Sequence, residues 1–265
     1  MPTTQTRTFT MTPSLSGELR RFAALKDGGS KEGKVLRGVV FDVDGTLCLQ
    51  QNYMFTEMRR VLDIHKSTDI LDHIHSLPEP SQSQAQESIR AIERKAMASQ
   101  EPQPGLVPLM SYLESRSLPK GICTRNFDAP VAHLLSKFLK GKVFEPIITR
   151  EFKPPKPDPA GILHIAKSWG LVNGDGEGDA RDLIMVGDSV DDMTAGYRAG
   201  AATVLLVNEQ NAHLAEHEHT DLCISRLDEL IEVLEDGFVG RIGREDKESD
   251  LKGRAEEVLR SGKGE

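Results

Sequence analysis

The stretch VVFDVDGT, residues 39–46, decides the fold because it joins a short apolar run to two carboxylates and a glycine. An apolar run of this kind predicts a strand that is buried on both faces of a sheet. Asp42 and Asp44 then point the same way along the extended backbone, and Gly45 lets the chain turn sharply after them. In such a pair, one aspartate can attack an electrophile while the other gives and takes a proton.

Similar apolar runs recur along the chain and predict the fold class. The first covers residues 36–41, and others lie at residues 121–123, 146–148, 183–186 and 202–207. Segments with helical periodicity lie between them. Because strands and helices alternate, we expect an α/β fold with a doubly wound, Rossmann-like parallel sheet of about five strands. The ligand site of such a sheet lies at the carboxyl ends of its strands.

The pattern also predicts how the chain is divided. Residues 50–103 contain no convincing strand but several helical patterns, which indicates a small all-helical insertion after the first strand. The α/β core would then comprise residues 36–49 and 104–235. We expect residues 1–35 to be a flexible N-terminal segment and residues 236–265 to be a charged C-terminal tail.

The composition limits the kinds of partner. The chain has 265 residues, of which 38% are hydrophobic and 28% charged, as in soluble globular proteins. Its 41 acidic and 33 basic side chains give a formal net charge of −8, so we expect no nucleic-acid partner. The sequence has no apolar run long enough for a membrane span. Three scattered cysteines suit a reducing compartment, so we expect a cytoplasmic protein, with a mitochondrial presequence at the N-terminus as the alternative.

A second acidic group follows the fourth apolar run, in the sequence LIMVGDSVDD of residues 183–192. Asp188 is expected at the strand end, and Asp192, four residues later, lies on the same face of the first helical turn. We interpret Asp191 as a partner of the helix N-terminus. Carboxylates gathered with Asp42 at one sheet edge would repel one another unless a cation joined them, and oxygen ligands suit magnesium.

Two further strand ends carry groups that could bind an anion. Thr124 follows the run at residues 121–123 and is itself followed by Arg125 and Asn126. Lys156 lies in the proline-rich sequence KPPKPDP, whose stiffness would hold an ammonium group in place. Together with the aspartates, these side chains would form a cationic and hydrogen-bonding cradle.

Four motifs in this order make the sequence resemble the haloacid dehalogenase superfamily of hydrolases. They are DVDGT at residues 42–46, CTRN at residues 123–126, KPDP at residues 156–159 and GDSVDD at residues 187–192. The resemblance covers residues 38–207. Within the third motif we choose Lys156 over Lys153 because it keeps the Lys-Pro-x-Pro spacing of related phosphatases.

The resemblance implies a role for each acid. Asp42 would be the nucleophile that forms an aspartyl-phosphate, and Asp44 would protonate the leaving oxygen and later activate water. Magnesium would be held by Asp42, the backbone carbonyl of Asp44 and Asp188. Asp192 would support the metal directly or through water.

The resemblance also assigns the phosphate-binding groups and the insertion. Thr124 would bind the phosphoryl oxygens and Lys156 would neutralise their charge, with Arg125 and Asn126 as further substrate-binding residues. The insertion would be a short α-helical cap of the C1 type. Its candidate substrate contacts are Tyr53, Arg59 and Arg60, although polar residues on an amphipathic helix are commonly just solvated.

The resemblance also limits the class of reaction that we expect. Dehalogenases, phosphonatases and ion-pumping ATPases of this superfamily lack an aspartate at the position of Asp44. We therefore expect a magnesium-dependent phosphomonoester hydrolase that acts on a small phosphorylated metabolite, as a monomer or a homodimer. The alternatives are a sugar phosphomutase of the same superfamily and a catalytically silent binding or regulatory protein.

Overall fold

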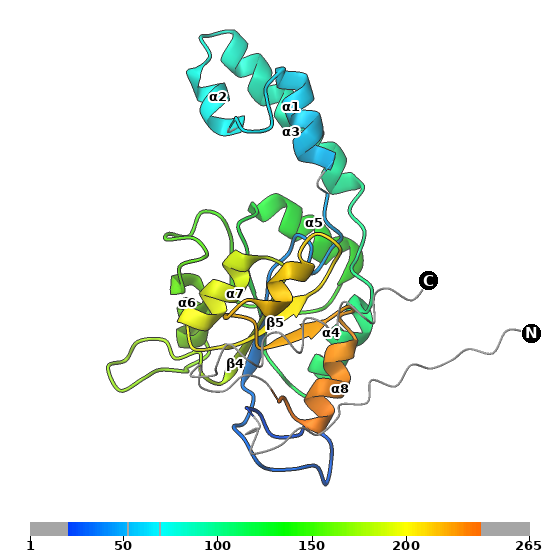
Figure 1. Cartoon of the computed structure of the whole chain (residues 1–265), viewed down its shortest axis with the longest axis vertical. Coiled ribbons are helices and arrows are strands. Elements are labelled where there is room, and N and C mark those ends of the chain that lie inside the picture. Colours follow the sequence, from blue (N-terminus) through cyan, green and yellow to red (C-terminus); the bar gives the residue numbers. More distant parts are fainter. Residues whose placement is uncertain (1–20, 52, 69, 240–265) are drawn as a thin grey trace, which may run out of the picture.

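A computed structural model describes residues 21–239 except residues 52 and 69. Its centre is a parallel sheet flanked by helices (Figure 1). The sheet has six strands in the order β3-β2-β1-β4-β5-β6. The strands are β1 Gly38–Phe41, β2 Lys120–Cys123, β3 Ile147–Ile148, β4 Leu183–Gly187, β5 Ala202–Leu206 and β6 Leu222–Ile224. The doubly wound α/β fold is thereby confirmed, with one strand more than the sequence predicts.

The additional strand, β6, lies at the edge of the sheet and pairs with β5 alone. It has three residues, and Leu222 and Cys223 are partly exposed. All three residues are apolar, but a run of three that follows the acidic Asp221 is too short for periodicity to distinguish it from a loop.

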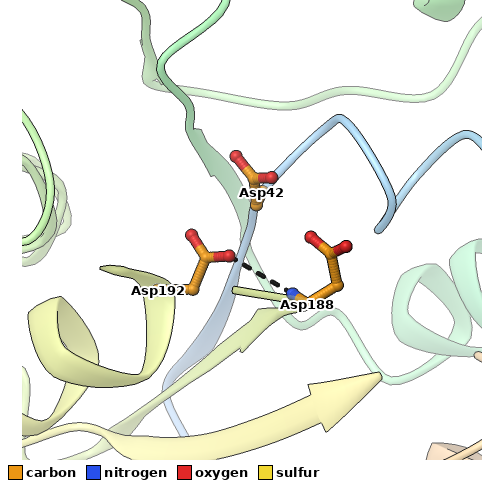
Figure 2. A group of neighbouring side chains, drawn as sticks. All are labelled: Asp42, Asp188 and Asp192. Atoms are coloured by element: carbon orange, nitrogen blue, oxygen red, sulfur yellow. Dashed lines mark hydrogen bonds between the residues drawn. The ribbon is translucent and has the colours of Figure 1, made fainter. Parts of the chain in front are cut away.

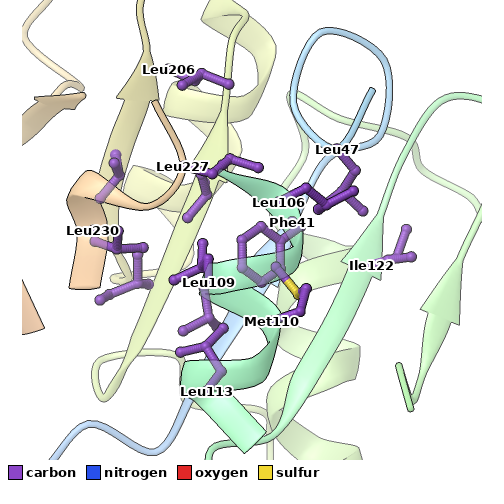
Figure 3. Close-up of a cluster of buried hydrophobic side chains, with 14 of the residues drawn as sticks. Phe41, Leu47, Leu106, Leu109, Met110, Leu113, Ile122, Leu206, Leu227 and Leu230 are labelled. Atoms are coloured by element: carbon purple, nitrogen blue, oxygen red, sulfur yellow. The ribbon is translucent and has the colours of Figure 1, made fainter. Parts of the chain in front are cut away.

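Helices cover both faces of the sheet. On one face α4 Leu106–Ser115, α5 Asp128–Phe138 and α8 Glu229–Asp236 share a core with Val39 and Phe41 of β1 (Figure 3). On the other face α6 Ala160–Ser168 and α7 Val190–Arg198 pack against Val40 and the neighbouring strands. Because β1 is buried from both sides, every residue of that strand is apolar or glycine.

The segment after β1 leaves the sheet and forms α1 Tyr53–Leu62, α2 Ile70–Ser76 and α3 Ser81–Ala98. These helices are the regular elements of the described residues between β1 and α4, and they project away from the sheet (Figure 1). They have a small apolar cluster of their own, made of Met58, Ile70, Ile74, Ala85 and Ile89. A short 3-10 helix, Ala212–Glu216, follows β5.

Within the expected N-terminal segment of residues 1–35, Arg21 and Phe22 pack against the rest of the fold. Phe22 is 1% exposed and packs edge-on against Phe238, with ring centroids 5.8 Å apart. Arg21 forms an ion pair with Asp221 at 3.3 Å. These contacts join residues about 200 positions apart, which local patterns do not reveal, and they extend the core at both ends of the described residues.

Residues 1–20 and 240–265, which contain the rest of the expected N-terminal segment and nearly all of the expected tail, lie outside the described residues. Within the described residues, every helix is too short or too polar to cross a membrane.

Candidate active site

The site lies at the carboxyl ends of three adjacent strands. Phe41 of β1 is in register with Ile122 of β2 on one side and with Val186 of β4 on the other. Because parallel strands end at a common edge, the residues that follow them are brought together from distant parts of the sequence. Asp42 and Asp188 come from two of these strand ends and face a shared space (Figure 2).

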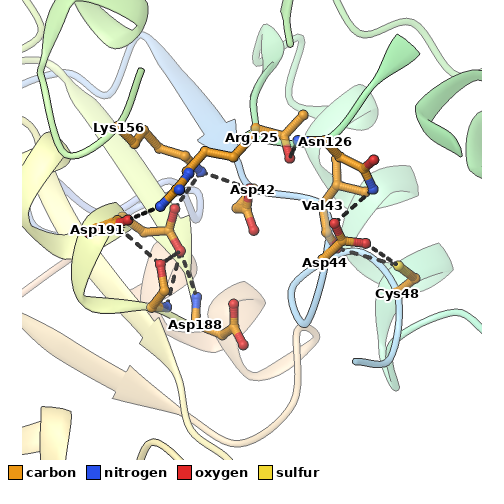
Figure 4. A network of polar contacts seen from close by, with 12 residues as sticks. Asp42, Val43, Asp44, Cys48, Arg125, Asn126, Lys156, Asp188 and Asp191 are labelled. Atoms are coloured by element: carbon orange, nitrogen blue, oxygen red, sulfur yellow. Dashed lines mark hydrogen bonds and ion pairs between the residues drawn. The ribbon is translucent and has the colours of Figure 1, made fainter. Parts of the chain in front are cut away.

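Three aspartates form a compact buried cluster. Asp42, Asp188 and Asp192 each offer a carboxylate oxygen, and these oxygens lie within 4.8 Å of one another. The three residues are only 8%, 4% and 1% exposed. The side chain of Asp44 is directed elsewhere, toward Asn126 and Cys48 (Figure 4). The sequence suggests four aspartates for metal binding. The structure brings the carboxylates of three of them together, whereas the carboxylate of Asp44 lies outside the cluster.

Lys156 bridges two of these aspartates. Its Nζ lies 2.7 Å from Asp42 Oδ1 and 2.5 Å from Asp192 Oδ1, and the residue is buried. Burial lowers the pKa of Lys156, but the charges of Asp192 and Asp42 outweigh this effect and raise it. The ammonium group is therefore charged and fixed beside Asp42. The alternative residue Lys153 is exposed.

Asp192 is held from several directions. Its Oδ2 accepts hydrogen bonds from Ser189 Oγ at 2.6 Å, Ser189 N at 3.0 Å and Asp188 N at 3.2 Å. Ser189 Oγ in turn accepts from Asp192 N, which completes a capping box at the start of α7. Both carboxylate oxygens of Asp192 are thus engaged by protein groups. The pattern Ser-x-x-Asp could have indicated this arrangement in advance.

The cluster carries more negative than positive charge. Burial raises the pKa of Asp42 to about 7 even though Lys156 opposes the shift. Burial, together with the charges of Asp192 and Asp42, likewise raises the pKa of Asp188 to about 7. Buried carboxylates with raised pKa values, such as these two, need a further cation if both are to stay ionised. An all-oxygen ligand set at this spacing fits a hard divalent cation such as magnesium.

Asp44 has a separate environment beside the cluster. Asn126 Nδ2 donates to Asp44 Oδ2 at 2.7 Å (Figure 4). Asp44 as a whole residue is exposed, but protein atoms surround its carboxyl group, and this desolvation raises its pKa. The hydrogen bond from Asn126 lowers the pKa and so opposes the shift. Asn126, which the sequence suggests as a substrate-binding residue, therefore contacts the second aspartate of the first motif.

The other residues of the second motif have distinct surroundings. Thr124 is buried; its N–H donates to Ile148 O at 2.9 Å, and its Oγ1 accepts from Asn126 N at 3.2 Å. Arg125 reaches across to Asp191, with 2.5 Å between Nη1 and Oδ2. This pair adds a specific partner to Asp191 beyond the helix N-terminus.

Two residues that the sequence patterns do not single out hold Asp188. The side-chain amide of Gln50 donates to Asp188 Oδ2. Asn211 Nδ2 donates to the backbone carbonyl of Asp188 at 2.7 Å and to that of Leu206 at 3.0 Å. Gln50 follows the first motif by four residues and Asn211 comes after the fourth, but neither belongs to a motif, so no sequence pattern connects them to the site.

The candidate substrate contacts of the helical insertion have partners inside that insertion or at its end. Tyr53 Oη lies 2.9 Å from Ser99 Oγ. Arg60 forms an ion pair with Glu57 at 2.6 Å, and Arg59 Nη1 lies 3.4 Å from the backbone oxygen of Phe55. These contacts do not join the three side chains to the aspartate cluster.

Comparison with known proteins agrees with this geometry. Residues 36–200 match the family of haloacid dehalogenase-like hydrolases. The chain belongs to this family. An uncharacterized hydrolase of Saccharomyces cerevisiae is 44% identical over 208 residues, which cover 76% of this chain and 92% of the relative.

Solved structures of the same superfamily share the fold. A HAD hydrolase of family IA, variant 3, from Entamoeba histolytica aligns with a TM-score of 0.61 and 20% identity, covering 76% of this chain and 98% of that one. A predicted phosphoglycolate phosphatase of Haemophilus somnus aligns with a TM-score of 0.59 and 17% identity, covering 75% and 97%. The family match over residues 36–200 confirms the resemblance inferred from the four motifs, and the protein is a hydrolase of this family.

Proposed function

We propose that the protein is a magnesium-dependent phosphatase that hydrolyses the phosphate monoester of a small metabolite. The observation that carries this proposal is the separate environment of Asp44, held by Asn126 at 2.7 Å and placed two residues after Asp42. A nucleophile and an independent acid thus belong to one site. The fold shared with a protein described as a phosphatase supports the same reaction class.

The first step transfers the phosphoryl group to the enzyme. A carboxylate oxygen of Asp42 attacks phosphorus, and the bond between phosphorus and the substrate's alcohol oxygen breaks. Asp44 donates its proton to that departing oxygen. Desolvation of Asp44 raises its pKa and favours the protonated form that this step requires.

The second step releases phosphate. Asp44, now ionised, accepts a proton from a water molecule as the water oxygen attacks phosphorus of the aspartyl-phosphate. The bond between phosphorus and Asp42 breaks, inorganic phosphate leaves, and both aspartates return to their starting states. Lys156 and Thr124 hold the phosphoryl oxygens, with the ammonium of Lys156 already fixed 2.7 Å from Asp42.

Magnesium, when bound, neutralises the charge on the transferring phosphoryl group. Asp42, Asp188 and the backbone carbonyl of Asp44 would hold it. Because both oxygens of Asp192 are engaged by Lys156, Ser189 and Asp188 N, we assign Asp192 an indirect role.

A screen of phosphorylated metabolites tests the proposal. Released inorganic phosphate is measured with MgCl2 and again with EDTA, and p-nitrophenyl phosphate serves as a generic substrate. We expect magnesium-dependent release that EDTA abolishes. No release from any substrate would favour the silent binding protein, whereas isomerisation of a hexose phosphate without phosphate release would favour the phosphomutase.

A further inference from the structure

Gln50 lies where the chain leaves the core for the helical insertion. The outgoing and returning chains run side by side at this point: Leu49 N donates to Glu101 O at 2.9 Å, and Gln103 N donates to Leu47 O at 3.1 Å. These hydrogen bonds hold the backbone in place as far as residue 49. Gln50 is the next residue, so its backbone position is restricted by the bond to Leu49.

The side chain of Gln50 turns back to the aspartate cluster. Its amide nitrogen donates to Oδ2 of Asp188, a residue 138 positions later in the sequence. Gly45 borders the same oxygen, because a Cβ at residue 45 would collide with the Asp188 carboxylate. The loop after β1 therefore confines this carboxylate from two sides.

The three clustered carboxylates are held by different kinds of donor. Lys156 binds Asp42 and Asp192 and partly neutralises them. In the part of the chain that the structure describes, the donor found on the carboxylate of Asp188 is the neutral amide of Gln50. A neutral donor restricts how a carboxylate rotates but leaves its negative charge available to a cation.

We propose that Gln50 is a positioning residue, which orients the carboxylate of Asp188 for a divalent cation. This inference rests on the proposed function because it requires a cation bound by Asp188. Hydrogen bonds to a ligating carboxylate keep it in the coordinating orientation, and their loss typically weakens metal affinity by about 10- to 100-fold. The helical insertion thus contributes through its first connection, before its helices begin.

The adjacent residue provides a matched control. Gln51 has the same side chain, but its amide donates to Ala96 O at 2.8 Å and Ser99 Oγ at 3.2 Å, within the insertion. Gln50→Leu and Gln51→Leu each remove one such donor. Because Gln50 is exposed, the fold should tolerate its replacement, and Gln50→Ala serves as a second variant.

The test measures Mn2+ binding to the full chain without substrate, from the loss of the EPR signal of free Mn2+. Gln50→Leu and Gln50→Ala should weaken binding by about 10-fold or more, whereas Gln51→Leu should stay within about twofold of the unmodified protein. In phosphate-release assays, the Gln50 variants should need more Mg2+ for half-maximal rate yet recover most of the maximal rate at saturating Mg2+. A general structural defect would instead lower the rate at every Mg2+ concentration.

Asp188→Asn distinguishes a failure of the proposed metal site from a failure of the proposed role of Gln50. If the unmodified protein fails to bind Mn2+, or if Asp188→Asn binds as tightly, the metal site of the proposed function is wrong. If Asp188→Asn loses binding but the Gln50 variants bind like the unmodified protein, the role of Gln50 is overturned and the proposed function stands.

Discussion

The strand-end site and the helices between residues 53 and 98 use charged side chains in opposite ways. At the site, Lys156 and its two carboxylate partners are buried and bonded to one another. In the helices, the ion pair of Arg60 with Glu57 is exposed, with side chains 70% and 42% accessible. Buried charges are costly unless each has a partner, whereas exposed pairs contribute little to stability. The comparison teaches that substitutions at the site should have large effects on both activity and stability, and those on the helix surfaces small ones.

The largest effect is expected at Asp42. Asp42→Asn removes the nucleophilic carboxylate and should reduce kcat for phosphate release by at least about 10⁴-fold. Asp182→Asn is the control, because Asp182 precedes β4 at the opposite end of that strand and its side chain is 42% exposed. The control should retain full activity. A normal rate for Asp42→Asn would refute the aspartyl-phosphate mechanism.

Lys156 should matter for both activity and stability. Lys156→Met leaves the buried Asp42 and Asp192 without their shared cation. The free energy of unfolding should therefore fall by about 3–5 kcal/mol. Turnover should fall by about 100-fold or more because the phosphoryl oxygens lose a fixed positive charge. Urea unfolding and phosphate release measure the two effects.

Lys153→Met is the matched comparison. Lys153 also precedes a proline but is exposed, so its replacement should change stability by at most about 0.5 kcal/mol. Equal losses in the two variants would show that Lys156 is not the lysine of the third motif.

Substitutions in the main core and in the helical insertion should destabilise different parts of the molecule, the first the whole fold and the second the insertion alone. Leu109→Ala removes a fully buried side chain from the main core and should reduce the global free energy of unfolding by about 2–5 kcal/mol. Ile89→Ala affects the small cluster of the helical insertion. Its effect should appear mainly as faster hydrogen exchange within residues 53–98. Equally faster exchange in β1 and β4 would show that the two regions unfold as one.

The smallest effect is expected on the surface of α1. Arg60→Ala breaks an exposed ion pair and should leave the urea midpoint of unfolding essentially unchanged. The KM for the substrate should stay within about twofold, since Arg60 contacts Glu57 in the structure. A KM increase of about tenfold with unchanged kcat would instead identify Arg60 as a substrate contact.

The strand-end motifs can be predicted from the sequence because each is indicated by a few neighbouring residues. A buried apolar run followed by Asp42, or by Asp188, indicates a strand and its end, and parallel strands must share that edge. The same local reasoning missed β6, whose three residues form a strand because they pair with β5. It also places Phe22 in a flexible segment, residues 1–35, although Phe22 is buried against Phe238.

Partners within the site were harder to anticipate than the site itself. The sequence predicts that Asn126 and Arg125 bind substrate, and the structure adds a protein partner for each, Asp44 and Asp191. Side-chain type and spacing indicate what a residue can bind, but which of several partners it contacts depends on where the backbone places it.

The sequence by itself determined the α/β class, the order of the four motifs and the set of acids that meet at one sheet edge. These features follow from hydrophobic periodicity, which acts over a few residues, and from the general rule that parallel strands end at one edge of their sheet. Only the tertiary structure decided that Lys156 bridges Asp42 and Asp192 and that Gln50 contacts Asp188. These contacts join residues between 36 and 138 positions apart, and they exist because packing of the whole chain brings their backbones within hydrogen-bonding distance.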